Sequence, residues 1–299
     1  MSNNININGI LLLDKPKDVT SNKILQTIKR MFHANKAGHT GTLDPIATGM
    51  LPICFGYACK FSKYLLSDSK TYVATFKLGE TTDTFDIEGK VLQTRTVKQF
   101  NTEEILQVIN QFVGDIQQTP PKFSAIKHKG QPLYKLARKN IEVEIPSRNV
   151  TISKINLLSW NNPLLSVEIS CSKGTYIRSL ANDIGEVLGC GAHIVQLHRT
   201  FCDYFKSHPM YDMPAIEQNA ATQIEKILLP VEHAFCALPK LTLTPQEKQH
   251  LWHGRKAEIE LADMQDGLYS MYENSIFLGV CMLQENTFVD VTFYNPNFM

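Results

Sequence analysis

The chain has 299 residues, of which 43% are hydrophobic and 20% are charged, the proportions of an ordinary globular protein. This length favours about two domains, since one domain averages roughly 150 residues, and the composition excludes disordered and fibrous classes. The 30 basic and 29 acidic residues leave a formal charge of +1, so the whole chain lacks the charge excess typical of nucleic-acid-binding proteins. Any binding of RNA must therefore depend on local charge.

The seven cysteines are odd in number and scattered, and no two form a C-x-x-C pair. This distribution disfavours a disulfide framework or a zinc ribbon. Near the N-terminus the only apolar run is residues 10–13, without a basic stretch before it, and no later apolar stretch approaches the length of a membrane span. We therefore expect a cytoplasmic protein without membrane association.

The predicted elements begin with a short buried strand over residues 10–13. Lys15 and Pro16 are expected on the loop after it, because proline cannot extend a strand ladder. Ser21 is a suitable N-cap, and apolar residues at helical spacing predict a helix from there to about Phe32. Residues 36–52 contain three glycines, three threonines and two prolines, which predicts a long shaped loop without regular structure.

Further along, β-branched and aromatic residues predict strands over residues 71–76 and 165–171, and helices are expected over 102–112 and 177–188. Strands and helices alternate irregularly, which favours a mixed α+β fold over a doubly wound parallel sheet. The pattern changes near residue 235. A capping box of Thr244 and Glu247 around Pro245 is followed by strand-like runs over residues 268–272, 276–283 and 288–294. We therefore expect a body over residues 1–235 and a small β-rich module over 236–299.

The glycine-rich segment around Asp44 allows several interpretations. A phosphate-binding Walker loop is disfavoured, because Met50 follows Gly49 where such a loop requires lysine. Asp44 alone is as compatible with a turn before Pro45 as with catalysis. A carboxylate that acts as nucleophile or general base must stay ionised, and arginine is the cation best suited to keep it so. Arg178 is the candidate, although sequence spacing does not show that it meets Asp44.

Six segments, in this order along the chain, resemble the motifs of bacterial TruB-type tRNA pseudouridine synthases. They are residues 13–16 (LDKP), 38–49 (GHTGTLDPIATG), 70–72 (KTY), 82–89 (TDTFDIEG), 120–125 (PPKFSA) and 173–180 (KGTYIRSL). Residues 189–193 (GCGAH) and the leucine at 197 add to the resemblance. It spans roughly residues 8–205, and the C-terminal third matches more loosely. It implies a pseudouridine synthase fold, with a mixed or antiparallel sheet, flanking helices, a thumb-like insertion over about 120–148 and a PUA-like terminal module.

The resemblance implies an enzyme that isomerises uridine 55 in the T-loop of tRNA to pseudouridine, without a cofactor or a metal. Enzymes of this family flip the uridine out of the RNA stack. The aspartate that matches Asp44 then acts as nucleophile, either on the uracil ring or on the anomeric carbon of the ribose. By the same resemblance, Tyr72 stacks on the flipped base and is a candidate for removing the proton at carbon 5, while Arg178 pairs with the nucleophile.

Four further residues are assigned to the site by the resemblance alone. Tyr176 and Leu197 match residues that line the uracil pocket, and His39 matches the histidine that takes up the space left by the base. Lys15, with the proline after it, matches a pair near the site for which we expect structural support. Taken without the resemblance, Tyr72 is more readily a packing aromatic between strands. A histidine between glycines is then more often an exposed loop residue.

A basic segment without any acidic residue lies between residues 120 and 140. Its cations are Lys122, Lys127, Lys129, Lys135, Arg138 and Lys139. A solvated helix face is the simple interpretation, and a phosphate-binding patch is the functional one. In the family the matching segment closes over the T-loop, so these six are predicted RNA contacts. Asn140 stands where the family more often has glycine, and asparagine tolerates the left-handed backbone conformation.

The terminal module differs in charge, with eight acidic residues against four basic ones between residues 238 and 299. This balance argues against strong phosphate binding by the module itself. A metal site formed by Cys190, His193 and His198 is disfavoured, because a fourth ligand is lacking. A non-catalytic tRNA-binding or tRNA-folding protein and a nucleoside N-ribohydrolase remain as alternatives. We expect a monomer whose partner is the T-stem-loop of tRNA.

Overall fold

The computed structural model describes residues 7–66, 69–220, 223–256, 261 and 264–295. The chain forms two compact units, and the chain crosses between them several times. The first unit contains Met1–Asp44, Leu51–Ser67 and Tyr204–Met299, and the second contains Pro45–Met50 and Asp68–Asp203. No described helix is long and apolar enough to cross a membrane.

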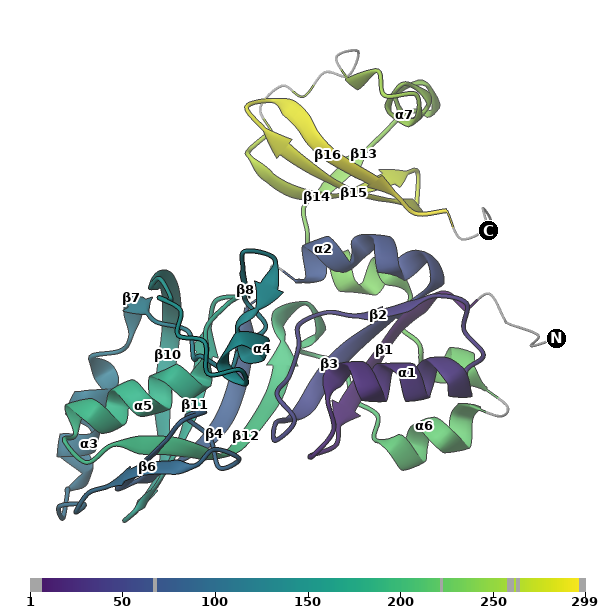
Figure 1. Cartoon of the computed structure of the whole chain (residues 1–299). Helices are drawn as coiled ribbons and strands as arrows, with labels where there is room; N and C mark the ends of the chain where they lie inside the picture. The colour runs from purple at the N-terminus through teal and green to yellow at the C-terminus, as the bar shows by residue number, and fades with distance from the viewer. Residues whose placement is uncertain (1–6, 67–68, 221–222, 257–260, 262–263, 296–299) are drawn as a thin grey trace. The chain divides into compact units, whose positions relative to one another are not determined.

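The second unit is built on a sheet in which β12, β4, β11, β10 and β7 are neighbours in that order, all antiparallel (Figure 1). Their bounds are β4 Lys70–Leu78, β7 Gly114–Gln118, β10 Arg148–Asn161, β11 Leu164–Cys171 and β12 Ala192–Cys202. Side chains of β11 alternate between buried and half-buried after its first residue, as expected of a strand with one face on a core. The predicted strands 71–76 and 165–171 are confirmed as β4 and β11.

Two helices accompany this sheet. Helix α5 (Ile177–Val187) packs against β12 and β4, and α3 (Thr102–Asn110) packs against β10. Helix α3 begins at a capping box in which the Asn101 side chain accepts from the backbone N–H of Glu104 and the Glu104 side chain accepts from that of Asn101. Both predicted helices are confirmed, and each ends one or two residues earlier than expected.

Short elements connect the long strands of the second unit. Strands β5 (Glu80–Thr82) and β6 (Val91–Thr94) pair with each other, as do β8 (Lys127–His128) and β9 (Gln131–Pro132). Helix α4 (Leu133–Ala137) follows β9 directly. Asn140, three residues after this helix, has φ of +53°, so the expected left-handed conformation is confirmed.

In the first unit, β1 (Gly9–Lys15) precedes α1 (Ser21–Met31), and β2 (Ala37–His39) pairs with β3 (Thr48–Phe55). The expectation of a structureless loop over residues 36–52 is therefore wrong at both ends. Strand pairing there satisfies the backbone groups in spite of the glycines, and the irregular segment shrinks to residues 40–47. The first residues of β3 belong to the second unit, where Thr48 and Gly49 pair in parallel with β12.

The start of α1 also corrects the sequence-based expectation. The N-cap is Thr20, whose hydroxyl accepts from the backbone N–H of Lys23 at 3.1 Å. Ser21 instead uses its hydroxyl on Leu43, donating to the carbonyl oxygen and accepting from the N–H, both at 2.9 Å. Because the Ser21 hydroxyl is hydrogen-bonded to the backbone of Leu43, Thr20 caps the helix instead.

The last strands of the chain form a separate four-stranded sheet in the order β13, β14, β15, β16. Their bounds are β13 Lys240–Thr242, β14 Gly267–Glu273, β15 Ile276–Gln284 and β16 Thr287–Phe293. The predicted capping box opens α7 (Pro245–Trp252), and the three predicted strands are confirmed. This sheet has its own cluster of buried apolar side chains. A domain boundary at residue 235 stays a prediction.

Within the first unit, an aromatic cluster joins these strands to the rest of the unit. Short helices over Gly56–Phe61 and Ser62–Leu65 (α2) supply Phe61, whose ring lies 5.8 Å from Phe235 and 6.4 Å from Phe277 between centroids. Phe61 and Phe235 are both fully buried. The remaining elements, α6 (Met213–Ala220) and short 3-10 helices over Asp203–Phe205, Ile224–Ile227 and Val231–Phe235, lie between β12 and β13 along the chain.

Candidate active site

Two of the predicted pocket residues, Tyr72 and Leu197, lie on neighbouring strands of the second unit. The register of β4 and β12 pairs Leu197 with Ala74 and Arg199 with Tyr72. Residues directly opposite in a sheet, and residues two apart on one strand, point to the same face. One buried face of the sheet therefore carries the side chains of Tyr72, Leu197 and Arg199.

Tyr72 is buried, and burial raises the pKa of its hydroxyl to about 12. The positive charge of Arg199 and a hydrogen bond with it act in the opposite direction, but burial outweighs them. The phenol therefore stays neutral at physiological pH. In this state it offers a flat ring and a hydrogen-bond donor.

Arg199 is a site residue that the sequence did not reveal. Its side chain is 1% exposed, and Nε donates to the carbonyl oxygen of Met50 at 2.6 Å. An arginine inside a strand is by default a surface residue, and the only available signal was its position two residues after Leu197. Gly49 shows how closely these chains approach, because a Cβ there would lie 2.2 Å from the carbonyl oxygen of Arg199.

Arg178 joins two segments that are separate motifs in the sequence. Nη1 donates to the carbonyl oxygen of Thr84 at 3.1 Å, and Nη2 donates to that of Phe123 at 2.9 Å. The same guanidinium forms an ion pair with Asp86, with Nη1 3.4 Å from Oδ2. Arg178 and Asp86 are both buried. The arginine therefore holds the loops over residues 82–89 and 120–125 together, and Asp86 is a second residue that the sequence did not reveal.

Asp44 belongs to the first unit, on the segment between β2 and β3, and its side chain is half-buried. The residue before it, Leu43, is fixed to Ser21 by the two hydrogen bonds described above. His39 is the last residue of β2 and is half-buried as well. The segment that carries the aspartate is thus anchored at Leu43, the residue before it, by two hydrogen bonds.

Lys15 is fully buried, although lysine is rarely so. It is the last residue of β1, and its ammonium group donates to the carbonyl oxygens of Pro16 at 2.8 Å and Val19 at 2.7 Å. The strand therefore continues two residues beyond the predicted end, and the expectation that Lys15 lies on the exit loop is wrong. The lysine side chain stabilises the turn between β1 and α1 by these two hydrogen bonds, which fits a supporting role.

All six cations of the basic segment are exposed. They are Lys122, Lys127, Lys129, Lys135, Arg138 and Lys139. The guanidinium carbon of Arg138 lies 5.7 Å from the ring centroid of Tyr134. The segment is held to the rest of the second unit through the backbone of Phe123.

The two histidines that could have been metal ligands have other contacts. Nδ1 of His198 lies 2.8 Å from the hydroxyl of Thr48, and Nδ1 of His193 lies 3.2 Å from the carbonyl oxygen of Glu80. Among the residues that the structure describes, no three histidine, cysteine or acidic side chains gather in a metal-binding arrangement. Both histidines instead stabilise the strands they lie on.

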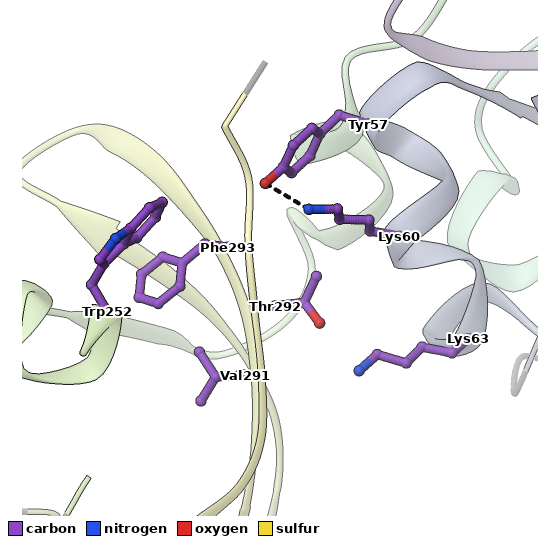
Figure 2. Close-up of a pocket in the computed structure, with 7 residues that line it drawn as sticks. All are labelled: Tyr57, Lys60, Lys63, Trp252, Val291, Thr292 and Phe293. Atoms are coloured by element: carbon purple, nitrogen blue, oxygen red, sulfur yellow. Dashed lines mark hydrogen bonds between the residues drawn. The ribbon is translucent and has the colours of Figure 1, made fainter. Parts of the chain in front are cut away.

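A pocket of about 570 Å³ lies within the first unit (Figure 2). It is lined by Tyr57, Lys60, Lys63, Trp252, Val291, Thr292 and Phe293. Figure 2 shows Lys60 directed at the hydroxyl of Tyr57, to which it donates at 3.0 Å, and the ring of Trp252 beside that of Phe293. No predicted catalytic residue lines this pocket.

Family models match most of the chain. Residues 29–177 match the model for the N-terminal domain of the TruB family pseudouridylate synthases, and residues 178–236 match that for the C-terminal domain of tRNA pseudouridylate synthase B. The chain belongs to the TruB family. This confirms the family expected from the motifs, and Asp44, Tyr72 and Arg178 all lie in matched segments.

Curated relatives of the TruB family extend the match to nearly the whole chain. A tRNA pseudouridine synthase B from Haemophilus influenzae is 45% identical over 284 residues, which are 93% of this chain and 91% of the relative. A protein of the same name from Actinobacillus succinogenes is 44% identical over 291 residues, 96% and 93% of the two chains.

Solved structures confirm the expected fold class. A chain of a Cbf5-Nop10-Gar1 complex is 25% identical with a TM-score of 0.72, over 96% of this chain and 84% of its own. A chain of an H/ACA RNP bound to a substrate RNA containing 2'-deoxyuridine is 23% identical with a TM-score of 0.73, over 97% and 86%. The second likeness shows the fold alone.

Proposed function

We propose that this protein is a tRNA pseudouridine synthase that isomerises uridine 55 in the T-loop of tRNA. Two findings support the proposal. The first is the identity of about 45% to relatives named tRNA pseudouridine synthase B over more than nine tenths of both chains. The second is the buried sheet face of the second unit that carries Tyr72, Leu197 and Arg199.

The observation that carries the proposal is the identity to the relatives named tRNA pseudouridine synthase B, and the segment after Asp44 leads directly to the second unit. Gly49 pairs with Arg199, and Arg199 pairs with Tyr72. Asp44 lies five residues before Gly49, and five residues span at most about 18 Å when fully extended. Asp44 is therefore close along the chain to the strand that pairs with Arg199.

In the proposed reaction the target uridine leaves the RNA stack, at a cost of a few kcal/mol that new contacts must offset. The carboxylate of Asp44 adds to the uracil ring or to the anomeric carbon, and the N1–C1′ bond breaks. The base then turns and forms the C5–C1′ bond, the bond to the carboxylate of Asp44 breaks, C5 loses its proton, and N1 gains one. The reaction is an isomerisation, so one nucleophile suffices and no group is consumed.

The basic segment supplies the proposed contact with the RNA backbone. Its six exposed cations have no acidic neighbour in sequence between residues 120 and 140. RNA loops are recognised by their shape and by splayed bases, with phosphate contacts that position them. A cationic segment held to the loops around Arg178 suits this task, since it couples phosphate binding to the proposed base pocket.

A substitution of the proposed nucleophile tests the function. The wild type should convert uridine 55 of a T-loop stem-loop, as seen by carbodiimide labelling, and Asp44→Asn should lower turnover at least about a thousandfold. Affinity for the RNA should stay within a few fold. Asp18→Asn, an isosteric change at an exposed aspartate with φ of +62°, is the matched control. Turnover retained by Asp44→Asn would contradict the assignment, and release of free uracil would indicate a hydrolase instead.

A further inference from the structure

Tyr176, a predicted pocket residue, is held through its backbone by one buried glutamine. Gln118 is the last residue of β7 and is fully buried. Its Nε2 donates to the carbonyl oxygen of Tyr176 at 3.0 Å, and its Oε1 accepts from the N–H of Tyr176 at 2.8 Å. One side chain thus satisfies both backbone groups of the residue that precedes α5.

The ring of Tyr176 is held by an arginine from the adjacent strand. Arg148 is the first residue of β10 and the direct cross-strand partner of Gln118. Its guanidinium carbon lies 4.8 Å from the centroid of the Tyr176 ring, within the range of a cation–π contact. Nη2 of the same group donates to the carbonyl oxygen of Gly174, which anchors the guanidinium beside the ring.

Arg148 contacts the Tyr176 ring as well as the backbone of Gly174. Its Nε is buried and has no hydrogen-bond partner among the described residues, an arrangement that costs free energy. Gly174 has φ of +84°, and a Cβ there would lie 3.5 Å from the guanidinium carbon. A larger residue in that left-handed conformation would be strained. The two-residue clamp, Gln118 and Arg148, therefore contacts Tyr176 from a pair of hydrogen-bonded neighbouring strands.

We propose that Gln118 and Arg148 are positioning residues that fix the Tyr176 ring for capture of the flipped base. This inference rests on the proposed function, in which Tyr176 lines the uracil pocket. Loss of the clamp leaves the ring free to rotate, so the productive geometry is populated less often. Because phosphate contacts elsewhere dominate RNA affinity, the effect should fall on kcat and leave KM nearly unchanged.

A double-mutant cycle tests the proposal. Arg148→Ala should lower kcat about tenfold with KM within about twofold. Arg148→Lys should restore the rate only in part, since an ammonium group keeps the cation beside the ring but lacks the planar fork that also reaches the Gly174 carbonyl oxygen. In the background of Tyr176→Ala, Arg148→Ala should cause no further loss, because its target is already gone. Lys154→Ala, an exposed change on the same strand, is the control.

The opposite outcomes are distinct. Arg148→Ala could instead weaken RNA binding equally with and without the Tyr176 ring, by raising KM alone. If the slope of log affinity against log salt also falls by about one charge, Arg148 binds a phosphate directly. Wild-type kcat in Arg148→Ala would also overturn the proposal. If the wild type itself makes no pseudouridine, the proposed function fails, whereas an active wild type with an unaffected Arg148→Ala variant refutes the clamp alone.

Gln118 is tested by a change that keeps its size. Gln118→Glu retains the acceptor for the Tyr176 N–H and loses the donor to its carbonyl oxygen. It should lower kcat when Tyr176 is present and leave kcat unchanged in the Tyr176→Ala variant. Thermal unfolding of each variant is measured in parallel, to detect any loss of stability. A loss of kcat of equal size in both backgrounds would show a general structural effect and contradict the positioning role.

Discussion

Arg178 forms a buried ion pair with Asp86, and Nη1 of the arginine lies 3.4 Å from Oδ2 of the carboxylate. The other carboxylate oxygen accepts from the hydroxyl of Thr84 at 2.5 Å and from the N–H of Glu88 at 3.1 Å. The arginine expected to meet Asp44 thus has a carboxylate partner inside its own unit. Asp86 fixes the guanidinium, and through it the loop that carries Phe123.

Removal of the Asp86 charge should destabilise the second unit. Asp86→Asn removes one buried carboxylate charge from the guanidinium of Arg178, and loss of one partner of a buried ion pair costs about 3–5 kcal/mol. Urea unfolding followed by fluorescence measures the change. Asp83→Asn is the control, since Asp83 accepts an exposed contact from the N–H of Lys90 at 2.8 Å and is not buried. Equal stability of the Asp86 variant and the wild type would show that the pair contributes nothing.

The raised pKa of Tyr72 predicts how this residue responds to pH. Burial raises it to about 12 from an ordinary value near 10, so the folded state holds a proton that the unfolded state releases first. The resulting stabilisation is fully present below about pH 10 and is lost as the pH rises to about 12. Tyr72→Phe removes this part of the pH dependence. Spectroscopic titration should find no Tyr72 phenolate below about pH 10, and a phenolate near pH 9 that Tyr72→Phe abolishes would contradict the burial argument.

The basic segment should contribute to RNA affinity through phosphate contacts. Substitution of Lys127, Lys129 and Lys135 by alanine should weaken binding of a T-loop stem-loop and reduce the slope of log affinity against log salt by about 2. Three exposed lysines elsewhere serve as the matched control, namely Lys23, Lys98 and Lys154. If both triple variants show the same slope, the segment is only a solvated surface.

Local signals predicted most of the regular elements. Alternating β-branched residues gave β4 and β11, and the capping box at Thr244 placed the start of α7 at the correct residue. Errors arose where a side chain serves a distant partner. Ser21 is a good N-cap by its chemistry, but its hydroxyl is hydrogen-bonded to the backbone of Leu43, 22 positions away. A local sequence pattern does not contain that contact.

The sequence by itself determined the family, and it singled out the glycine-rich segment around Asp44 and the basic segment as candidates, because these depend on residue types at short spacing. Only the tertiary structure decided which side chains meet. The pairing of Arg178 with Asp86, the burial of Arg199 beside Tyr72 and the clamp on Tyr176 join residues up to 127 positions apart. The physical reason is that strand register and burial arise from the whole fold, and they set the partners and the pKa values on which the proposed chemistry depends.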